Sequence, residues 1–145
     1  MTSHPPNSHS KEKHQAARSN AWRIAKDLPA SFRYAAQGIS YGLISQRNFR
    51  IHLVIGAFAL GLGIWLQLNY TQIAVLVLTV TAVLVLELLN TSIEAVVDLA
   101  IGRRFHPLAR IAKDCAAAAV LVASISSLVI AMLLIFPPLL SRLGR

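Results

Sequence analysis

The chain is 145 residues long, 55% hydrophobic and only 14% charged, with a mean hydropathy of +0.57. This length gives room for one domain, and the composition is too apolar for an ordinary soluble domain. The single cysteine, Cys115, cannot form an internal disulfide, so the fold does not depend on an oxidising compartment.

The net charge of +8 comes from basic residues that flank apolar runs. Eight of the fourteen lie in the first 50 positions, four lie between Arg103 and Lys113, and the last two are Arg142 and Arg145. Lys and Arg accumulate on the cytoplasmic flanks of membrane helices, and the chain has no nucleic-acid recognition motif. The charge therefore indicates membrane topology, and we expect no nucleic-acid partner.

The first residues are polar and then become amphipathic. Residues 1–20 contain Pro, Ser and three histidines without metal-ligand spacing, which predicts a disordered tail without a secretory signal. Apolar and basic residues alternate over residues 21–45, as in a helix that lies on the membrane surface. Pro29 interrupts this pattern and predicts a kink or two short pieces.

Three apolar segments follow, at about residues 50–68, 72–101 and 109–138. Each is long enough to cross the hydrocarbon core of a bilayer. Gly102 is expected to end the second helix, Pro107 to occupy the first turn of the third, and Pro137 and Pro138 to mark its exit. The predicted fold is an all-α integral membrane domain over residues 21–145, with a surface helix and three transmembrane helices.

The distribution of charge predicts the orientation of these spans. With three spans, the N-terminal segment and the loop over residues 102–113 share one side of the membrane. They hold twelve basic residues, against two in the C-terminal tail. We therefore expect the N-terminus to be cytoplasmic.

The second span carries a stripe of polar side chains. At about 100° per residue, one face about 100° wide collects five of them: Glu87, Asn90, Thr91, Glu94 and Asp98. Ionisable groups at membrane depth are costly and are functional candidates by default. The alternative is that Glu94 and Asp98 only form the solvated end of the helix.

Spacing separates the two glutamates. Seven residues place Glu87 and Glu94 roughly 10 Å apart along the axis. Since oxygen ligands sit about 2.0–2.6 Å from Mg²⁺ or Ca²⁺, one ion does not reach both comfortably. Glu94 suits a metal that carries a phosphate ligand, and the deeper Glu87 suits a lipid hydroxyl whose proton it accepts.

Lys113 and Asp114 lie near the start of the third span. A lysine can neutralise phosphate charge, and an adjacent acid can hold it or a ribose, although such a pair at a helix entry is common. No Walker-type phosphate loop and no GxGxxG motif is present. A bound nucleotide would therefore be held without either standard loop.

Two segments carry a family resemblance: Glu87-Leu-Leu-Asn-Thr-Ser-Ile-Glu-Ala-Val-Val-Asp98 and His106-Pro-Leu-Ala-Arg-Ile-Ala-Lys-Asp114. With the alanine-rich third span they closely resemble the prokaryotic diacylglycerol kinase family, over roughly Ser31 to Leu140. The Leu-Leu-Asn-Thr and His-Pro-Leu-Ala motifs resemble the undecaprenol kinase branch more than the proteobacterial diacylglycerol kinases.

The resemblance implies a homotrimer in the bacterial inner membrane. It implies transfer of the ATP γ-phosphate to a lipid hydroxyl, of diacylglycerol or undecaprenol, with Mg²⁺. It makes Glu87 the catalytic base and Glu94 the metal-linked carboxylate. Around the nucleotide it places Asn90, Glu94, Asp98, His106, Lys113 and Asp114.

One departure concerns the metal. The family usually has a glutamate beside the Phe-Arg of the first span, whereas residues 46–52 here contain no carboxylate. Gln46 or His52 is then the candidate first-helix partner, with Asp98 as a substitute. Arg50 is expected either to contact phosphate or to be a cytoplasmic anchor. A lipid kinase is the leading hypothesis, and a non-catalytic or degenerate membrane assembly protein of the same fold is the alternative.

Overall fold

The computed structural model describes residues 28–102 and 104–144, so the predicted tail and the start of the predicted surface helix lie outside the described residues. The chain divides into two compact units, Met1–Ser40 and Tyr41–Arg145. In the first unit residues 28–40 are helical, and large apolar side chains such as Phe32 and Tyr34 are exposed. This helix continues to residue 45, and no break follows Pro29.

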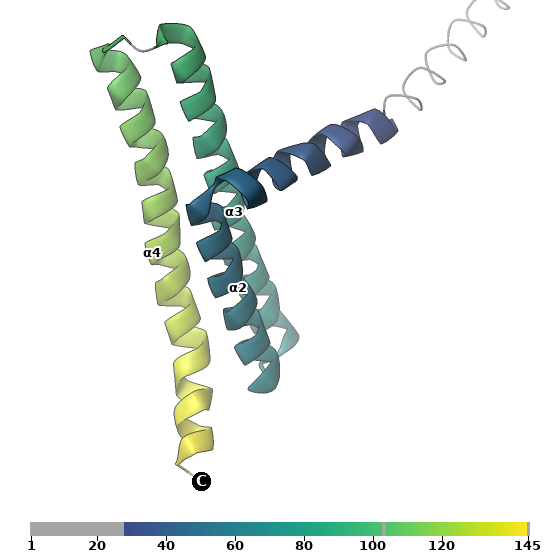
Figure 1. Ribbon diagram of the computed structural model, residues 1–145. Coiled ribbons are helices and arrows are strands. Elements are labelled where there is room, and N and C mark those ends of the chain that lie inside the picture. The colour runs from purple at the N-terminus through teal and green to yellow at the C-terminus, as the bar shows by residue number, and fades with distance from the viewer. Residues whose placement is uncertain (1–27, 103, 145) are drawn as a thin grey trace, which may run out of the picture. The chain divides into compact units, whose positions relative to one another are not determined.

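The second unit contains three long helices, α2 (Arg47–Trp65), α3 (Tyr70–Ile101) and α4 (Pro107–Leu143), shown in Figure 1. They have 19, 32 and 37 residues, and each is long and apolar enough to cross a membrane. At 1.5 Å per residue even the shortest is about 28 Å long, enough to span the hydrocarbon core. The secondary structure of the described residues is therefore entirely helical, as predicted. The three long apolar helices are those of a multi-pass membrane protein.

Residues at the helix ends explain where α2 ends and where α3 begins and ends. α2 ends at Trp65 rather than at residue 68, because Gln67 adopts a positive φ of 58° in the turn. Asn69 and Gln72 then form a capping box: Gln72 N donates to Asn69 Oδ1 at 2.9 Å, and Asn69 N donates to Gln72 Oε1 at 3.0 Å. Gly102, at φ +59°, ends α3 as expected.

The end of α4 differs from the prediction. The helix does not end at Pro137 and Pro138 but continues to Leu143. Beyond the prolines, Arg142 Nη1 donates to the carbonyl oxygen of Trp65 at 2.7 Å, and its guanidinium lies 4.4 Å from the centre of the Trp65 ring. A cation that binds an unpaired carbonyl at the C-terminus of α2 stabilises both helix ends, which gives the last turn of α4 a tertiary contact.

α3 is the central helix, because α2 and α4 both pack mainly against it. One cluster of buried apolar side chains lies towards the Trp65 end and consists of Leu66, Leu76 and Ile135. Phe49, Val83, Ala116 and Val120 are also buried. Elsewhere the unit exposes large apolar side chains, among them Val54, Phe58, Leu78, Leu121 and Leu133. Such a surface suits lipid or other membrane helices rather than water.

The crossing of α2 and α3 depends on Gly56, because a Cβ there would overlap Val80 Cγ1 of α3. A Cβ at Gly61 of the same helix would meet nothing within 4 Å. We expect Gly56→Ala to lower the unfolding free energy of the detergent-solubilised protein by about 1–3 kcal/mol, the usual cost of overpacking.

Gly61→Ala is the matched control for this prediction. It should be neutral or stabilise the helix by up to about 1 kcal/mol, because alanine favours helix more than glycine does. Thermal unfolding followed by far-ultraviolet circular dichroism compares the two variants. Equal unfolding temperatures would contradict a close contact at Gly56.

Candidate active site

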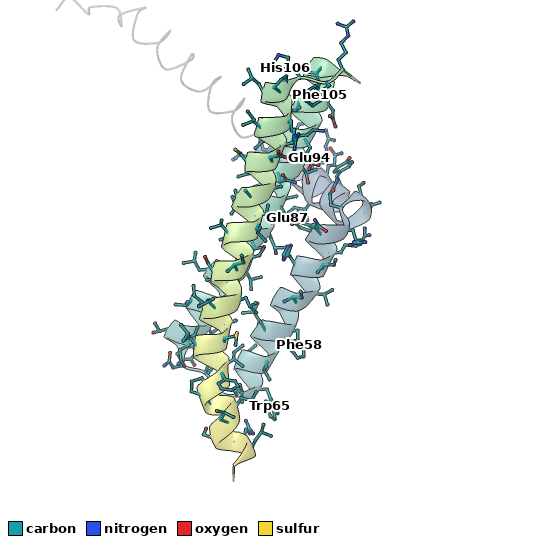
Figure 2. All side chains as sticks on the ribbon, turned by 90° about the vertical axis from the view of Figure 1, so that its left-hand side faces the viewer. Phe58, Trp65, Glu87, Glu94, Phe105 and His106 are labelled. Atoms are coloured by element: carbon teal, nitrogen blue, oxygen red, sulfur yellow. The ribbon has the colours of Figure 1, made fainter. Side chains whose placement is uncertain are left out.

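The polar stripe predicted on the second span lies in the half of α3 that leads to the α3–α4 loop. Figure 2 shows Glu87, Glu94 and His106 in that order towards the loop, with Phe58 and Trp65 towards the opposite end. Glu87 is the deepest of the three, and it is only 4% exposed. Its Oε1 lies 3.3 Å from Nε2 of His52, a side chain of α2.

Asn90 and Glu94 form a second polar pair, one helical turn apart on α3. Asn90 Nδ2 donates to Glu94 Oε1 at 3.2 Å. Asn90 Oδ1 is buried and has no hydrogen-bond partner among the described residues. A buried polar oxygen without a partner is unusual, and a bound cation would satisfy it. Two oxygen ligands, a carboxylate and an amide, are therefore adjacent at this point of α3.

The α3–α4 loop carries a third group of polar residues. Lys113 Nζ of α4 lies 2.5 Å from Asp98 Oδ1 of α3, so the two helices are joined by an ion pair. His106 is the N-cap of α4, and its Nδ1 accepts from Leu108 N at 3.2 Å. Asp114 pairs with Arg110 at 3.5 Å on the exposed face. A cavity of about 250 Å³ is lined in part by His106, Arg110, Lys113 and Asp114.

Arg50 was expected either to contact phosphate or to be a cytoplasmic anchor, and the structure shows a further contact. Its Nη1 donates to the carbonyl oxygens of Leu43 and Ile44, at 3.0 and 2.9 Å. These carbonyls belong to the last turn of the helix that ends at residue 45, where backbone oxygens lack helical partners. Arg50 therefore caps the C-terminal end of that helix.

The two candidate first-helix metal partners occupy different places. His52 faces Glu87 rather than being paired with Glu94. Gln46 is the N-cap of α2, and its side chain makes no capping hydrogen bond. Within residues 28–102 and 104–144, no three His, Cys, Asp or Glu side chains come together as a metal site would need. Any metal bound here would need amide or other oxygens beside Glu94.

The arrangement separates two kinds of chemistry along one helix. A buried carboxylate with a histidine partner is suited to proton transfer. The amide and carboxylate oxygens of Asn90 and Glu94 are suited to a hard cation. Beyond them, the loop cavity presents basic side chains that can neutralise phosphate. The order along α3 fits a reaction between a group at membrane depth and an anionic molecule at the loop end.

Comparison with known proteins agrees with this chemistry. A family model described as prokaryotic diacylglycerol kinase matches residues 33–135, most of the chain. The chain belongs to the prokaryotic diacylglycerol kinase family. It is therefore a lipid kinase, and membership of this family implies ATP as the phosphate donor.

Some of the similar proteins are named diacylglycerol kinase, and another is named undecaprenol kinase. The kinase is 51% identical over 124 residues to a diacylglycerol kinase of Synechocystis, which covers 86% of this chain and 71% of that one. It is 38% identical over 109 residues to an undecaprenol kinase of Bacillus subtilis, which covers 75% and 88%. A diacylglycerol kinase of Escherichia coli is 34% identical over 96 residues, which covers 66% and 78%. The higher identity to a diacylglycerol kinase does not support the expected closeness to the undecaprenol kinase branch.

Sequence reasoning found the stripe but not all of its partners. The contact between His52 and Glu87 joins two helices, so no spacing within one helix indicates it. The ion pair between Lys113 and Asp98 also joins two helices, so the sequence does not indicate it, although it places both residues near the nucleotide. The four-residue spacing of Asn90 and Glu94 did contain a signal, since such pairs are neighbours on a helix.

Proposed function

We propose that the kinase transfers the γ-phosphate of ATP to the hydroxyl of diacylglycerol, with Glu87 as the catalytic base. The observation that carries the proposal is a buried carboxylate at membrane depth in a chain of this family. The lipid oxygen forms a bond to the γ-phosphorus, and the bond from that phosphorus to the β-phosphate oxygen of ATP breaks. ADP leaves, and the hydroxyl proton passes to Glu87 and then to water.

The identity of the acceptor lipid rests on the relatives. The 51% identity to a protein named diacylglycerol kinase favours diacylglycerol. The Leu-Leu-Asn-Thr and His-Pro-Leu-Ala segments favour undecaprenol, and they are short beside the 124 residues of that match. We therefore take diacylglycerol as the preferred acceptor and undecaprenol as the competing one.

A competition assay tests this preference. The full chain in mixed micelles receives labelled ATP and Mg²⁺ with both lipids at equal mole fraction, and the labelled products are separated. We expect labelled phosphatidic acid to exceed labelled undecaprenyl phosphate. The opposite ratio would make undecaprenol the substrate, and labelling of neither lipid would favour the non-catalytic alternative.

The donor set at Glu94 fits Mg²⁺, because carboxylate and amide oxygens are ligands that this ion accepts. Glu94 would hold it together with Asn90 Oδ1, which has no hydrogen-bond partner among the described residues. Gln46 stays a further candidate from the sequence. When bound, Mg²⁺ would neutralise charge on the transferring phosphates. His52 is not proposed as a ligand, since its Nε2 faces Glu87.

We place the nucleotide beside the α3–α4 loop, with Asp98, His106, Lys113 and Asp114 around it. The cavity at this loop and the lysine that faces it support the placement. The side chains of Lys113 and Asp98 are 37% and 60% exposed, so an ATP phosphate can reach the ammonium group. Asp98 would then orient the lysine rather than contact phosphate.

A substitution at Lys113 checks the placement. We expect Lys113→Met to raise the KM for ATP about tenfold, the loss of one hydrogen bond to a charged group, with a smaller effect on the KM for lipid. Arg142→Met removes a positive charge from the other end of α4 and is the control, with an unchanged KM for ATP. Equal effects of the two variants would argue against a phosphate contact at Lys113.

Assembly and orientation are also part of the proposal. We propose a homotrimer in the bacterial inner membrane, as the family resemblance implies. The described residues of one subunit bring no group of three His, Cys, Asp or Glu side chains together, which supports a site that other copies complete. The basic residues around the α3–α4 loop support a cytoplasmic loop and a cytoplasmic N-terminus. Cross-linking in native membranes tests the trimer.

A further inference from the structure

His52 of α2 contacts the carboxylate that the proposed reaction uses. We propose that His52 is a positioning residue: it occupies Oε1 of Glu87 and leaves Oε2 to accept the proton of the lipid hydroxyl. The inference rests on the proposed role of Glu87 as the base. It adds a second helix and a second side chain to the catalytic arrangement.

The imidazole and the carboxylate lie at ion-pair distance from each other. Nε2 lies 3.3 Å from Oε1, and the two side chains are 25% and 5% exposed. Nε2 carries a proton in the imidazolium and in one of the two neutral tautomers, so the contact does not require a charged histidine. A glutamate side chain has considerable rotational freedom, and one fixed oxygen removes much of it.

The contact is held between two rigid helices. His52 lies one helical turn before Gly56, where a Cβ would overlap Val80 Cγ1 of α3. The backbones on either side of the His52–Glu87 pair are therefore fixed by packing. Reacting groups need near-ideal placement, because a displacement of about 1 Å can cost on the order of 100-fold in rate.

The other described ion pairs leave this role to His52. Lys113 is paired with Asp98, and Arg110 with Asp114. Both pairs lie near the α3–α4 loop, away from Glu87. Glu94 interacts with Asn90. Among the ion pairs of the described residues, His52 is thus the partner of Glu87, and it is not engaged with the proposed metal ligands.

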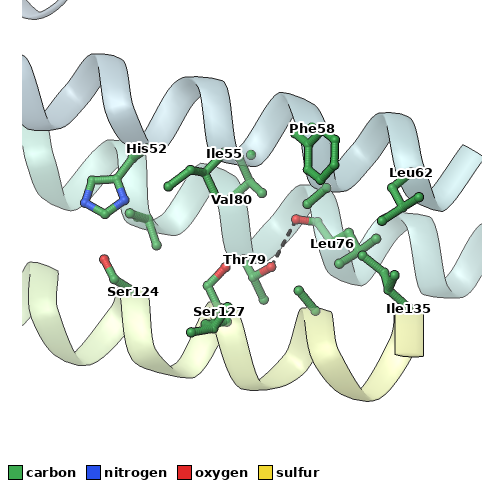
Figure 3. A pocket seen from close by; sticks show the side chains of 15 residues that line it. His52, Ile55, Phe58, Leu62, Leu76, Thr79, Val80, Ser124, Ser127 and Ile135 are labelled. Atoms are coloured by element: carbon green, nitrogen blue, oxygen red, sulfur yellow. Dashed lines mark hydrogen bonds between the residues drawn. The ribbon is translucent and has the colours of Figure 1, made fainter. Parts of the chain in front are cut away.

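His52 also lines a cavity of about 350 Å³ between α2, α3 and α4. Figure 3 shows the imidazole at one end of this cavity, with Ser124 facing it from α4 and Thr79 farther along. Most of the remaining lining is apolar, including Ile55 and Leu76. Removal of the imidazole would join its volume to an existing cavity, so free imidazole could enter the vacated position.

Chemical rescue tests the proposal on the full-length enzyme. We expect His52→Ala to lower kcat by on the order of 100-fold while the KM values for ATP and lipid change little. Added imidazole should restore part of kcat. His52→Gln can still donate an amide N–H and should retain most of the activity, whereas His52→Leu fills space without a donor and should not.

A matched control substitutes a polar residue of the same cavity. Thr79 Oγ1 donates to the carbonyl of Leu76 in its own helix, at 3.0 Å, so Thr79→Val removes a hydroxyl without freeing a partner on another helix. We expect this variant to keep wild-type kcat. If His52→Ala fails to fold, the comparison of His52→Gln with His52→Leu still decides.

Three results would overturn the proposal. One is full activity in His52→Leu, which would make the role one of packing alone. Another is a higher Mg²⁺ requirement with normal kcat at saturating Mg²⁺, which would make His52 a metal ligand. The third is a failure of imidazole to rescue a folded His52→Ala. A fully active Glu87→Gln with His52 intact would instead refute the proposed base.

Discussion

Glu87→Gln is expected to lower kcat by about 1,000-fold, within the usual contribution of a general base. The amide has nearly the shape of the carboxylate, and its oxygen can still lie beside His52 Nε2. It cannot accept the proton of the lipid hydroxyl. The KM values for ATP and lipid should therefore change little, and the helical content should not change. Steady-state kinetics in mixed micelles and circular dichroism measure these quantities.

Glu87→Asp is the informative comparison for that variant. It keeps a carboxylate but withdraws it by one methylene from both His52 and the hydroxyl. Its kcat should fall between wild type and Glu87→Gln. If Glu87→Gln keeps more than about a tenth of wild-type kcat, proton transfer to this residue is not a main contribution to catalysis.

Glu94→Gln is expected to raise the Mg²⁺ concentration needed for half-maximal activity by on the order of 100-fold, through weaker metal binding. The variant replaces a charged oxygen ligand with a neutral one, and Asn90 would then be paired with another amide. Activity measured against Mg²⁺ concentration at fixed ATP gives the shift. At saturating Mg²⁺ much of kcat should return.

Asn90→Ala separates the amide from the carboxylate at this position. Because it removes the partnerless Oδ1 and leaves Glu94 charged, it should shift the Mg²⁺ curve in the same direction by a smaller factor. An unchanged curve in Glu94→Gln would remove Glu94 from the metal site. It would leave the assignment of Glu87 intact, because the two carboxylates are assigned separate roles.

The fold followed closely from the sequence because its strongest signals are long apolar runs. Such runs predicted three spans, and Gly102 and Pro107 placed the loop between α3 and α4. The ends were less predictable. Pro137 and Pro138 indicated an exit, but the structure continues α4 to Leu143, where Arg142 binds Trp65 of α2. A contact between residues 77 positions apart has no signature in local sequence.

In the candidate site, too, the sequence predicts what lies within one helix but not the contacts between helices. Helical geometry alone gathered Glu87, Asn90 and Glu94 on one face of α3, since one regular helix determines their spacing. The partner of Glu87 depends on how α2 packs against α3, including the close approach of Gly56 to Val80. The sequence therefore indicates His52 only as a metal partner for Glu94. Arg50, expected at phosphate or as an anchor, also donates to the carbonyl oxygens of Leu43 and Ile44, a contact that the sequence did not indicate.

In the proposed reaction phosphate moves from ATP to a lipid hydroxyl and not to water. The most direct measurement follows the label from γ-labelled ATP as the mole fraction of diacylglycerol in the micelles is raised. We predict labelled phosphatidic acid in proportion to the occupied lipid site, with little labelled inorganic phosphate. Release of inorganic phosphate at the same rate with and without lipid, and no labelled phospholipid, would contradict the account.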